Sequence, residues 1–309
     1  MSTKKAAAAV SPAPFTLAHA RADHWGLAVK ACLEGVADAA AGANVGFLYA
    51  TEAFAADLPS ILTFLRETTR IQSWVGAVTP GIVAGDQEYR DGGALAVMVG
   101  GLDPDSFRCF ASLDAADLRR GIGGLPYGVA LVHGDPRNPG LPALVEAAAG
   151  DAGFLVGGLV SLAGPPAQVA DSVVSGGLSG LLLAPEIEVV AGLTQGCSPL
   201  GPSHLVTEAS DGVLMKLDGR PALEVLKEDA GELIARDIRR AAGYIHVGLP
   251  VPGSDTGDYL VRTLVGMDPR QNWLAVGDRV EVGTRLMFVR RDANAARADM
   301  RRMLDGVTA

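Results

Sequence analysis

Two stretches of the sequence share one pattern of glycines and apolar residues. Residues 74–85 (WVGAVTPGIVAG), followed by 92–100 (GGALAVMVG), resemble residues 155–164 (LVGGLVSLAG), followed by 176–184 (GGLSGLLLA). Self-similarity of this kind is the sequence signature of repeated structural units. The pattern predicts an internal duplication of a helix-plus-hairpin unit. The alternative is that glycine-rich hairpins simply look alike.

Apolar periodicity predicts the elements around these stretches. Apolar residues at helical spacing predict helices at 19–41, 55–70 and 139–149. Pro59 is compatible with the second of these helices only near its first turn. Short apolar runs bounded by glycine predict strands at 44–50, 73–78, 94–99, 128–132, 153–156 and 178–183.

A segment rich in proline and glycine, LTQGCSPLGP at 193–202, predicts a domain boundary near residue 192. Beyond it, Ser210-Asp211-Gly212 and Asp218-Gly219 are turn signals between strands. Pro221 is expected as the first residue of a helix. Further predicted elements are a helix at 229–241, strands at 244–249, 259–266 and 285–290, and an amphipathic closing helix at 290–304.

These elements define an α+β protein with two domains of mixed sheets flanked by helices. The predicted division is a flexible leader at 1–17, a domain with two pseudo-repeats at 18–192, and a second domain at 193–309. A length of 309 residues agrees with two domains.

Composition excludes several classes of protein. The net charge of -9 and the lack of a concentrated basic face argue against a nucleic-acid partner. Three cysteines, Cys32, Cys109 and Cys197, are too few and too odd a set for a disulfide framework, which favours a cytoplasmic protein. No apolar stretch is long enough to predict a membrane span.

Motifs for chemistry are sparse. No phosphate-binding loop is present, and no His or Cys cluster has the spacing of a zinc site, so neither a nucleotide nor a metal is expected. No catalytic set is apparent. Two alternatives stay open: a cysteine-dependent enzyme that uses Cys197 with His204 or His246, and haem ligation by His246, His204 or His133.

Several ordered pieces of the chain resemble one protein family. The most specific is Thr194-Gln195-Gly196-Cys197-Ser198-Pro199-Leu200-Gly201, similar to the family's Ser-Gln-Gly-Cys-Arg-Pro-Ile-Gly. Val75-Gly76, Val156-Gly157-Gly158 and Leu217-Asp218-Gly219-Arg220 also match. From about Ala18 onward the chain resembles the FIST family in its FIST_N plus FIST_C arrangement.

The resemblance implies a sensory role in signal transduction, with a small ligand such as an amino acid or small carboxylate. Some members are linked to haem. Two departures matter: Ser198 stands where the family usually has Arg, and Ala77 where it often has a Cys or another small polar residue. A missing guanidinium removes a carboxylate clamp, so the ligand cannot simply be carried over.

Together these observations predict a small-molecule ligand in a pocket shared by the two domains. Its expected lining comes from the glycine turns and the cysteine motif, with Arg262 as the source of positive charge: Gly76, Thr79, Gly81, Gly157, Gly158, Gln195, Gly196, Cys197, Ser198 and Arg262. No output domain is recognised, so a separate signalling partner protein is expected, with no nucleic acid and no membrane. A purely scaffolding role is the remaining alternative.

Overall fold

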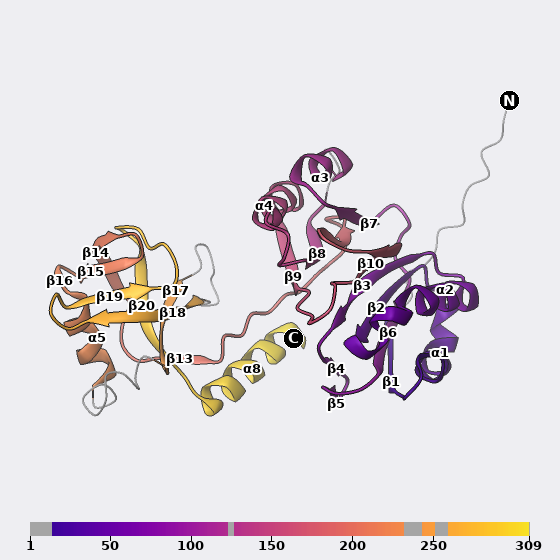
Figure 1. Cartoon of the computed structure of the whole chain (residues 1–309), viewed down its shortest axis with the longest axis horizontal. Coiled ribbons are helices and arrows are strands. Elements are labelled where there is room, and N and C mark those ends of the chain that lie inside the picture. Colours follow the sequence, from indigo (N-terminus) through magenta and orange to yellow (C-terminus); the bar gives the residue numbers. More distant parts are fainter. Residues whose placement is uncertain (1–13, 123–126, 232–242, 251–258, 309) are drawn as a thin grey trace. The chain divides into compact units, whose positions relative to one another are not determined.

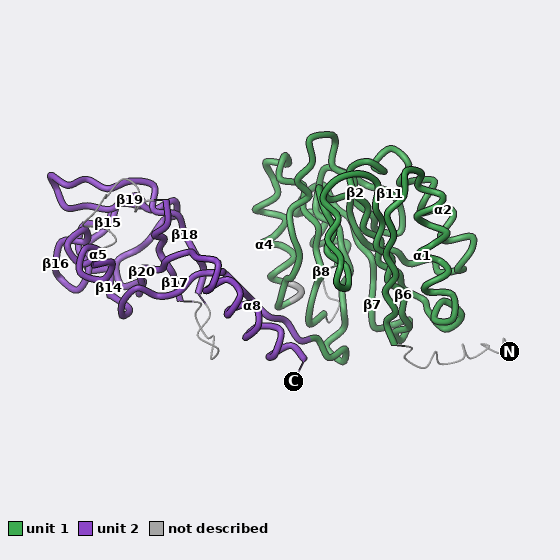
Figure 2. The backbone as a smooth tube through the Cα atoms, turned by 90° about the horizontal axis from the view of Figure 1, so that it is seen from below, with its two compact units in different colours: residues 1–189 green, residues 190–309 purple. Residues whose placement is uncertain are grey.

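A computed structural model describes residues 14–122, 127–231, 243–250 and 259–308 (Figure 1). The chain divides into two compact units, residues 1–189 and 190–309 (Figure 2). Each unit has its own hydrophobic core, and each is described by itself. The predicted fold class is confirmed, because both units combine helices with sheets, and the first contains parallel and antiparallel strand pairs.

The first half of unit 1 alternates strands and helices before it reaches a short hairpin. Its elements are β1 (Thr16–Arg21), α1 (Trp25–Ala40), β2 (Val45–Thr51), η1 (Glu52–Asp57), α2 (Leu58–Thr69), β3 (Ser73–Thr79), β4 (Ile82–Ala84), β5 (Gln87–Tyr89) and β6 (Ala94–Gly100). In the sheet the order is β1-β6-β2-β3, with β2 and β3 parallel.

The second half of unit 1 follows the same sequence of elements. They are β7 (Phe107–Ser112), α3 (Ala115–Ile122), β8 (Val129–Gly134), α4 (Leu141–Ala152), β9 (Phe154–Leu159), β10 (Gln168–Ala170), β11 (Ser172–Val174) and β12 (Leu178–Leu183). The sheet order β7-β12-β8-β9 matches β1-β6-β2-β3, and β8 and β9 are again parallel. A common origin of the two halves stays a prediction.

Unit 1 is layered, with helices outside and two sheets between them (Figure 2). α1 and α2 pack on the first sheet around Trp74 and Leu48, and α3 and α4 pack on the second around Leu144 and Leu182. The inner faces of the two sheets meet in a further apolar cluster, which includes Phe47, Val75 and Leu181. The hairpin β10–β11 leaves the second half and joins the first sheet beside β3.

Two of the predicted glycine positions have a backbone reason to be glycine. A Cβ on Gly76 would lie 1.8 Å from the carbonyl oxygen of Leu48, and one on Gly157 would lie 1.9 Å from that of Val132. Such distances are far below van der Waals contact, so only glycine fits between the paired strands. Both glycines lie inside strands, β3 and β9, and not in the turns that the sequence predicted.

Unit 2 is a closed antiparallel barrel with a helix at its end. Its elements are β13 (Cys197–Pro199), β14 (His204–Ser210), β15 (Val213–Leu217), β16 (Arg220–Pro221), α5 (Ala222–Ala230), β17 (Ile245–Pro250), β18 (Tyr259–Asp268), β19 (Trp273–Val276), β20 (Arg285–Arg291) and α8 (Ala293–Thr308). The path β20-β14-β15-β19-β18-β17 closes on itself because β17 also pairs with β20. Apolar residues of α5, such as Leu223 and Leu226, complete the core.

Most predicted elements of the chain are found, with informative exceptions. The predicted helix at 19–41 is wrong at its start, because residues up to Arg21 form β1 and the helix begins at Trp25. Pro221 is the residue before α5 and not its first residue. The turn at Asp211-Gly212 is confirmed, with φ values of 46° and 79° that suit a tight hairpin. Most of the predicted helix at 229–241 lies outside the described residues.

Candidate ligand-binding site

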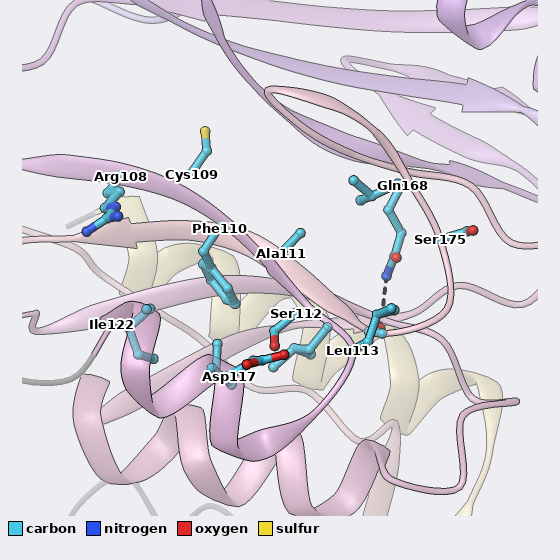
Figure 3. A pocket seen from close by; sticks show the side chains of 15 residues that line it. Arg108, Cys109, Phe110, Ala111, Ser112, Leu113, Asp117, Ile122, Gln168 and Ser175 are labelled. Carbon is cyan, nitrogen blue, oxygen red and sulfur yellow. Dashed lines mark hydrogen bonds between the residues drawn. The ribbon is translucent and has the colours of Figure 1, made fainter.

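A cavity of about 720 Å³ follows the outer edge of β7 in unit 1 (Figure 3). One side of the cavity is lined by residues 108–113, which comprise most of β7 and the residue after it. One face of α3, from Asp117 to Ile122, and residues between Val174 and Leu178 complete the lining, together with Gln168. Its volume is in the range of pockets that hold small molecules.

The cavity exists because β7 is an edge strand. Among the described strands, only β12 pairs with β7, so alternate backbone N–H and C=O groups of β7 point outward. Side chains alternate along the strand: Phe110 packs with the α3 residues Leu118 and Ile122, whereas the Cys109 thiol donates to the Trp74 carbonyl oxygen at 3.7 Å. A ligand in the cavity therefore meets both backbone groups and two kinds of side chain.

The cavity carries one positive and one negative side chain. The exposed Arg108 makes no hydrogen bond or ion pair within the described residues. Asp117 lies in the first turn of α3 and pairs with Arg120 on the exposed side of the helix. Asp114 caps the start of this helix, since its Oδ1 accepts from the backbone N–H groups of Ala116 and Asp117, both at 2.9 Å. The cap thereby fixes where Asp117 sits beside the end of β7.

Buried polar groups brace the opposite wall. The Gln168 side chain is buried (Figure 3), and its amide donates to the carbonyl oxygens of His133 at 2.6 Å and Gly177 at 3.4 Å. These bonds tie the segment before β12 to β8. Burial, followed by the charge of Asp171, raises the pKa of Cys109, so this thiol lines the cavity as a neutral group.

A second cavity, of about 330 Å³, lies between the first sheet and the hairpin β4–β5. It contains the predicted residues Thr79 and Gly81, and most of its lining is apolar. At its inner side the Tyr49 hydroxyl is 3.0 Å from His133 Nε2. Burial lowers the pKa of His133 to about 4 and raises that of Tyr49 to about 12, so both groups are neutral near pH 7.

The cysteine motif of unit 2 is held by one carboxylate. Asp299 Oδ2, on α8, accepts hydrogen bonds from Thr194 Oγ1 at 2.7 Å, from the backbone N–H of Gln195 at 2.9 Å and from that of Gly196 at 3.3 Å. Burial raises the pKa of Asp299, but these bonds and those from Arg302 outweigh burial and lower it to about 2. The motif therefore anchors α8 to the barrel.

The remaining predicted residues of unit 2 are committed to local contacts. The buried Cys197 thiol donates to the carbonyl oxygen of Gln195 at 3.5 Å, and the Tyr259 hydroxyl donates to the carbonyl oxygen of Cys197 at 2.8 Å. Arg262 on β18 is paired with Asp278, so its charge is already neutralised. Ser198 lies on β13 opposite Arg290. The pocket shared by both units stays a prediction.

The three candidate haem ligands, His133, His204 and His246, each have defined contacts or burial in the structure. Both ring nitrogens of His204 contact carboxylates, Asp218 at 2.7 Å and Asp229 at 2.9 Å. His133 is buried against Tyr49, and His246 lies buried on β17. Across the described ranges, no group of His, Cys, Asp and Glu side chains is placed to hold a metal ion. In the same residues, no helix has the length and apolar character needed to cross a membrane.

Of the predicted site residues, the structure brings Thr79 and Gly81 together at the smaller cavity and Gln195 to Ser198 together at the α8 anchor. Gly158 lies on the exposed strand β9, with open space where a Cβ would be. Arg108, Phe110 and Asp117 were missed by sequence reasoning. The alternating run FRCFAS at 107–112, followed by a capping Asp, was the available signal.

The chain combines a layered α/β unit with a barrel unit, and comparison with known proteins shows the family to which it belongs. The FIST N domain matches residues 44–220, and the FIST C domain matches residues 222–309. The chain belongs to the FIST family, whose domains are associated with signal transduction and small-ligand sensing. The boundary between the two matches falls at Pro221 in β16, inside the second compact unit.

Mycobacterial relatives share much of the chain. An uncharacterized protein of Mycobacterium tuberculosis is 33% identical over 264 residues, which is 78% of this chain and 66% of that protein. An uncharacterized protein of Mycobacterium bovis is 30% identical over 249 residues, which is 74% of this chain and 62% of that protein. The chain thus matches just under two thirds of the length of these relatives.

Proposed function

We propose that this protein is a cytoplasmic sensor that binds a free amino acid in the cavity along β7 and passes the signal to a separate partner protein. The observation that carries the proposal is the Arg108 guanidinium, which lines a ligand-sized cavity without a partner among the described residues. Family membership supports small-ligand sensing in general.

The lining matches the chemistry of an amino acid. A guanidinium presents paired N–H donors that fit a carboxylate, so Arg108 would bind the α-carboxylate. The outward backbone C=O groups of β7 offer acceptors for the α-ammonium group, whereas the Asp117 carboxylate is paired with Arg120 and lies beside the other end of the strand (Figure 3). Phe110 and Ile122 provide an apolar wall for a side chain. The outward backbone groups of β7 supply further hydrogen bonds, as they would to an added strand.

This assignment replaces Arg262 by Arg108 as the source of positive charge. Arg262 is paired with Asp278, whereas Arg108 has no hydrogen-bond or ion-pair partner in the part of the chain that the structure describes. Arg108 is exposed, so the strength of its ion pair with a ligand depends on how far the ligand excludes water when it binds.

Isothermal titration calorimetry against the common amino acids tests the proposal. We expect at least one of them to bind, and Arg108→Met to weaken that binding by about 10- to 100-fold, the effect of losing a hydrogen bond to a charged group. Arg119→Met is the matched control, because Arg119 lies on α3 but does not line the cavity. Its affinity should equal that of the wild type.

A second titration separates the two charged residues of the lining. Asp117→Asn should bind the amino acid as tightly as the wild type, because the Asp117 carboxylate is paired with Arg120 and lies beside the other end of β7 from Arg108. No heat with any amino acid, or full affinity in Arg108→Met, would refute the proposal.

A further inference from the structure

The strand β9 is an unpaired edge with apolar side chains in solvent. Among the described strands it pairs only with β8. Phe154 is 50% exposed, Val156 is 40% exposed and Leu159 is 62% exposed. An open edge with exposed apolar residues is a template for pairing with another strand, and proteins usually protect such edges with charge, proline or a covering segment. β9 has no charged residue and no proline.

The corresponding strand in the first half of unit 1 shows how such an edge is covered. β3 occupies the place in its sheet that β9 occupies in the other, and the outer edge of β3 is paired with β10. The register places Gln168 opposite Ala77 and Ala170 opposite Val75. The outer edge of β3 is therefore covered by an antiparallel neighbour, whereas no described strand covers the outer edge of β9.

The hairpin β4–β5, which is the counterpart of β10–β11 in the first half, does not pair with β9. Only Pro80 and Gly81 separate β3 from β4, whereas residues 160–167 separate β9 from β10. Instead, Ile82 and Ala84 of β4 pack against Ala96 on the first sheet.

We propose that β9 pairs with β9 of a second copy of this chain, antiparallel and about a two-fold axis, so that the two four-stranded sheets become one. Antiparallel self-pairing satisfies the outward backbone groups of both strands. Because β9 carries no charge, no like charges face each other across the axis. A two-fold contact also uses the same surface on both copies and closes the assembly as a dimer.

Analytical ultracentrifugation of the full chain tests the proposal. The wild type should sediment as a dimer at micromolar concentrations, and Val156→Lys combined with Leu159→Lys should sediment as a monomer. Both side chains are exposed, so the fold should tolerate lysine, and an unchanged thermal melt would show this. Val83→Lys is the matched control, since Val83 is 77% exposed on the short strand β4 and should leave the dimer intact.

Hydrogen exchange gives a second readout that does not depend on a variant. The amides of β9 should exchange more slowly as the protein concentration rises, while those of β4 should not change. A wild-type monomer, a dimer that persists in the double lysine variant, or β9 amides that are equally protected at every concentration would overturn the proposal. Amino-acid binding at Arg108 is a separate site, so its failure would leave this test unaffected.

Discussion

Replacing Asp299 by Asn should loosen the attachment of α8 to the barrel of unit 2. In the folded protein Asp299 accepts from Thr194, Gln195 and Gly196 through one oxygen and from Arg302 through the other. Its side chain is only 17% exposed, so solvent screens these bonds weakly. Asn keeps the shape of the side chain but loses the charge and one of the two acceptors.

The size of the effect follows from the pKa of Asp299, which falls from 3.8 to about 2 on folding. A shift of this size corresponds to about 2 kcal/mol in favour of the anchored state at neutral pH. Because folding lowers the pKa, this contribution is complete above pH 3.8 and is lost as the pH falls towards 2. Asp299→Asn should lack that acid-dependent loss.

Hydrogen exchange followed by mass spectrometry measures the local opening of this region. Amides of residues 195–197 and of α8 should exchange roughly thirtyfold faster in Asp299→Asn than in the wild type at neutral pH, the equivalent of about 2 kcal/mol. Asp305→Asn is the matched control, because Asp305 lies on the same helix and its side chain makes no hydrogen bond among the described residues. Equal protection in Asp299→Asn and Asp305→Asn would refute the anchoring role.

Two further predictions concern the frame of each unit. Gly157→Ala should destabilise unit 1 by about 2 kcal/mol or more in urea unfolding, because the new Cβ collides with the Val132 carbonyl oxygen. The neighbouring Gly158→Ala places its Cβ in open space and should be nearly neutral. Equal urea stability of the two variants would contradict this. Burial lowers the pKa of His204, but Asp218 and Asp229 more than offset this and raise it, so unit 2 should lose stability as the pH rises above 6.5. His204→Gln should abolish that loss in urea titrations at a series of pH values, and an unchanged slope would argue against the carboxylate contacts.

Local sequence signals predicted most of the helices and strands but not the pairing of β1 with β6 or the closure of the barrel in unit 2. The runs at 44–50 and 94–99 form β2 and β6 because they are apolar on both faces and lie between two layers. The start of the predicted helix at 19–41 failed because β1 is stabilised by its pairing with β6, far away in the sequence. Closure of the barrel through β17 and β20 has the same non-local origin.

The candidate site was harder to predict than the fold. Arg108 belongs to no motif, and its importance depends on α3 and the segment before β12 folding around the free edge of β7. By contrast, the motif Gln195-Gly196-Cys197 is distinctive in sequence, yet its backbone is held by Asp299, about a hundred residues later, which no local pattern indicates. Distinctive residues can thus serve architecture while the open functional groups lie elsewhere.

A crystal structure of the protein with its best-binding amino acid tests the central claim most directly. The account predicts the α-carboxylate within hydrogen-bond distance of the Arg108 guanidinium, with the ligand lying along the edge of β7. An amino acid bound instead at the Gln195–Ser198 segment, or beneath the hairpin β4–β5, with Arg108 untouched, would contradict it.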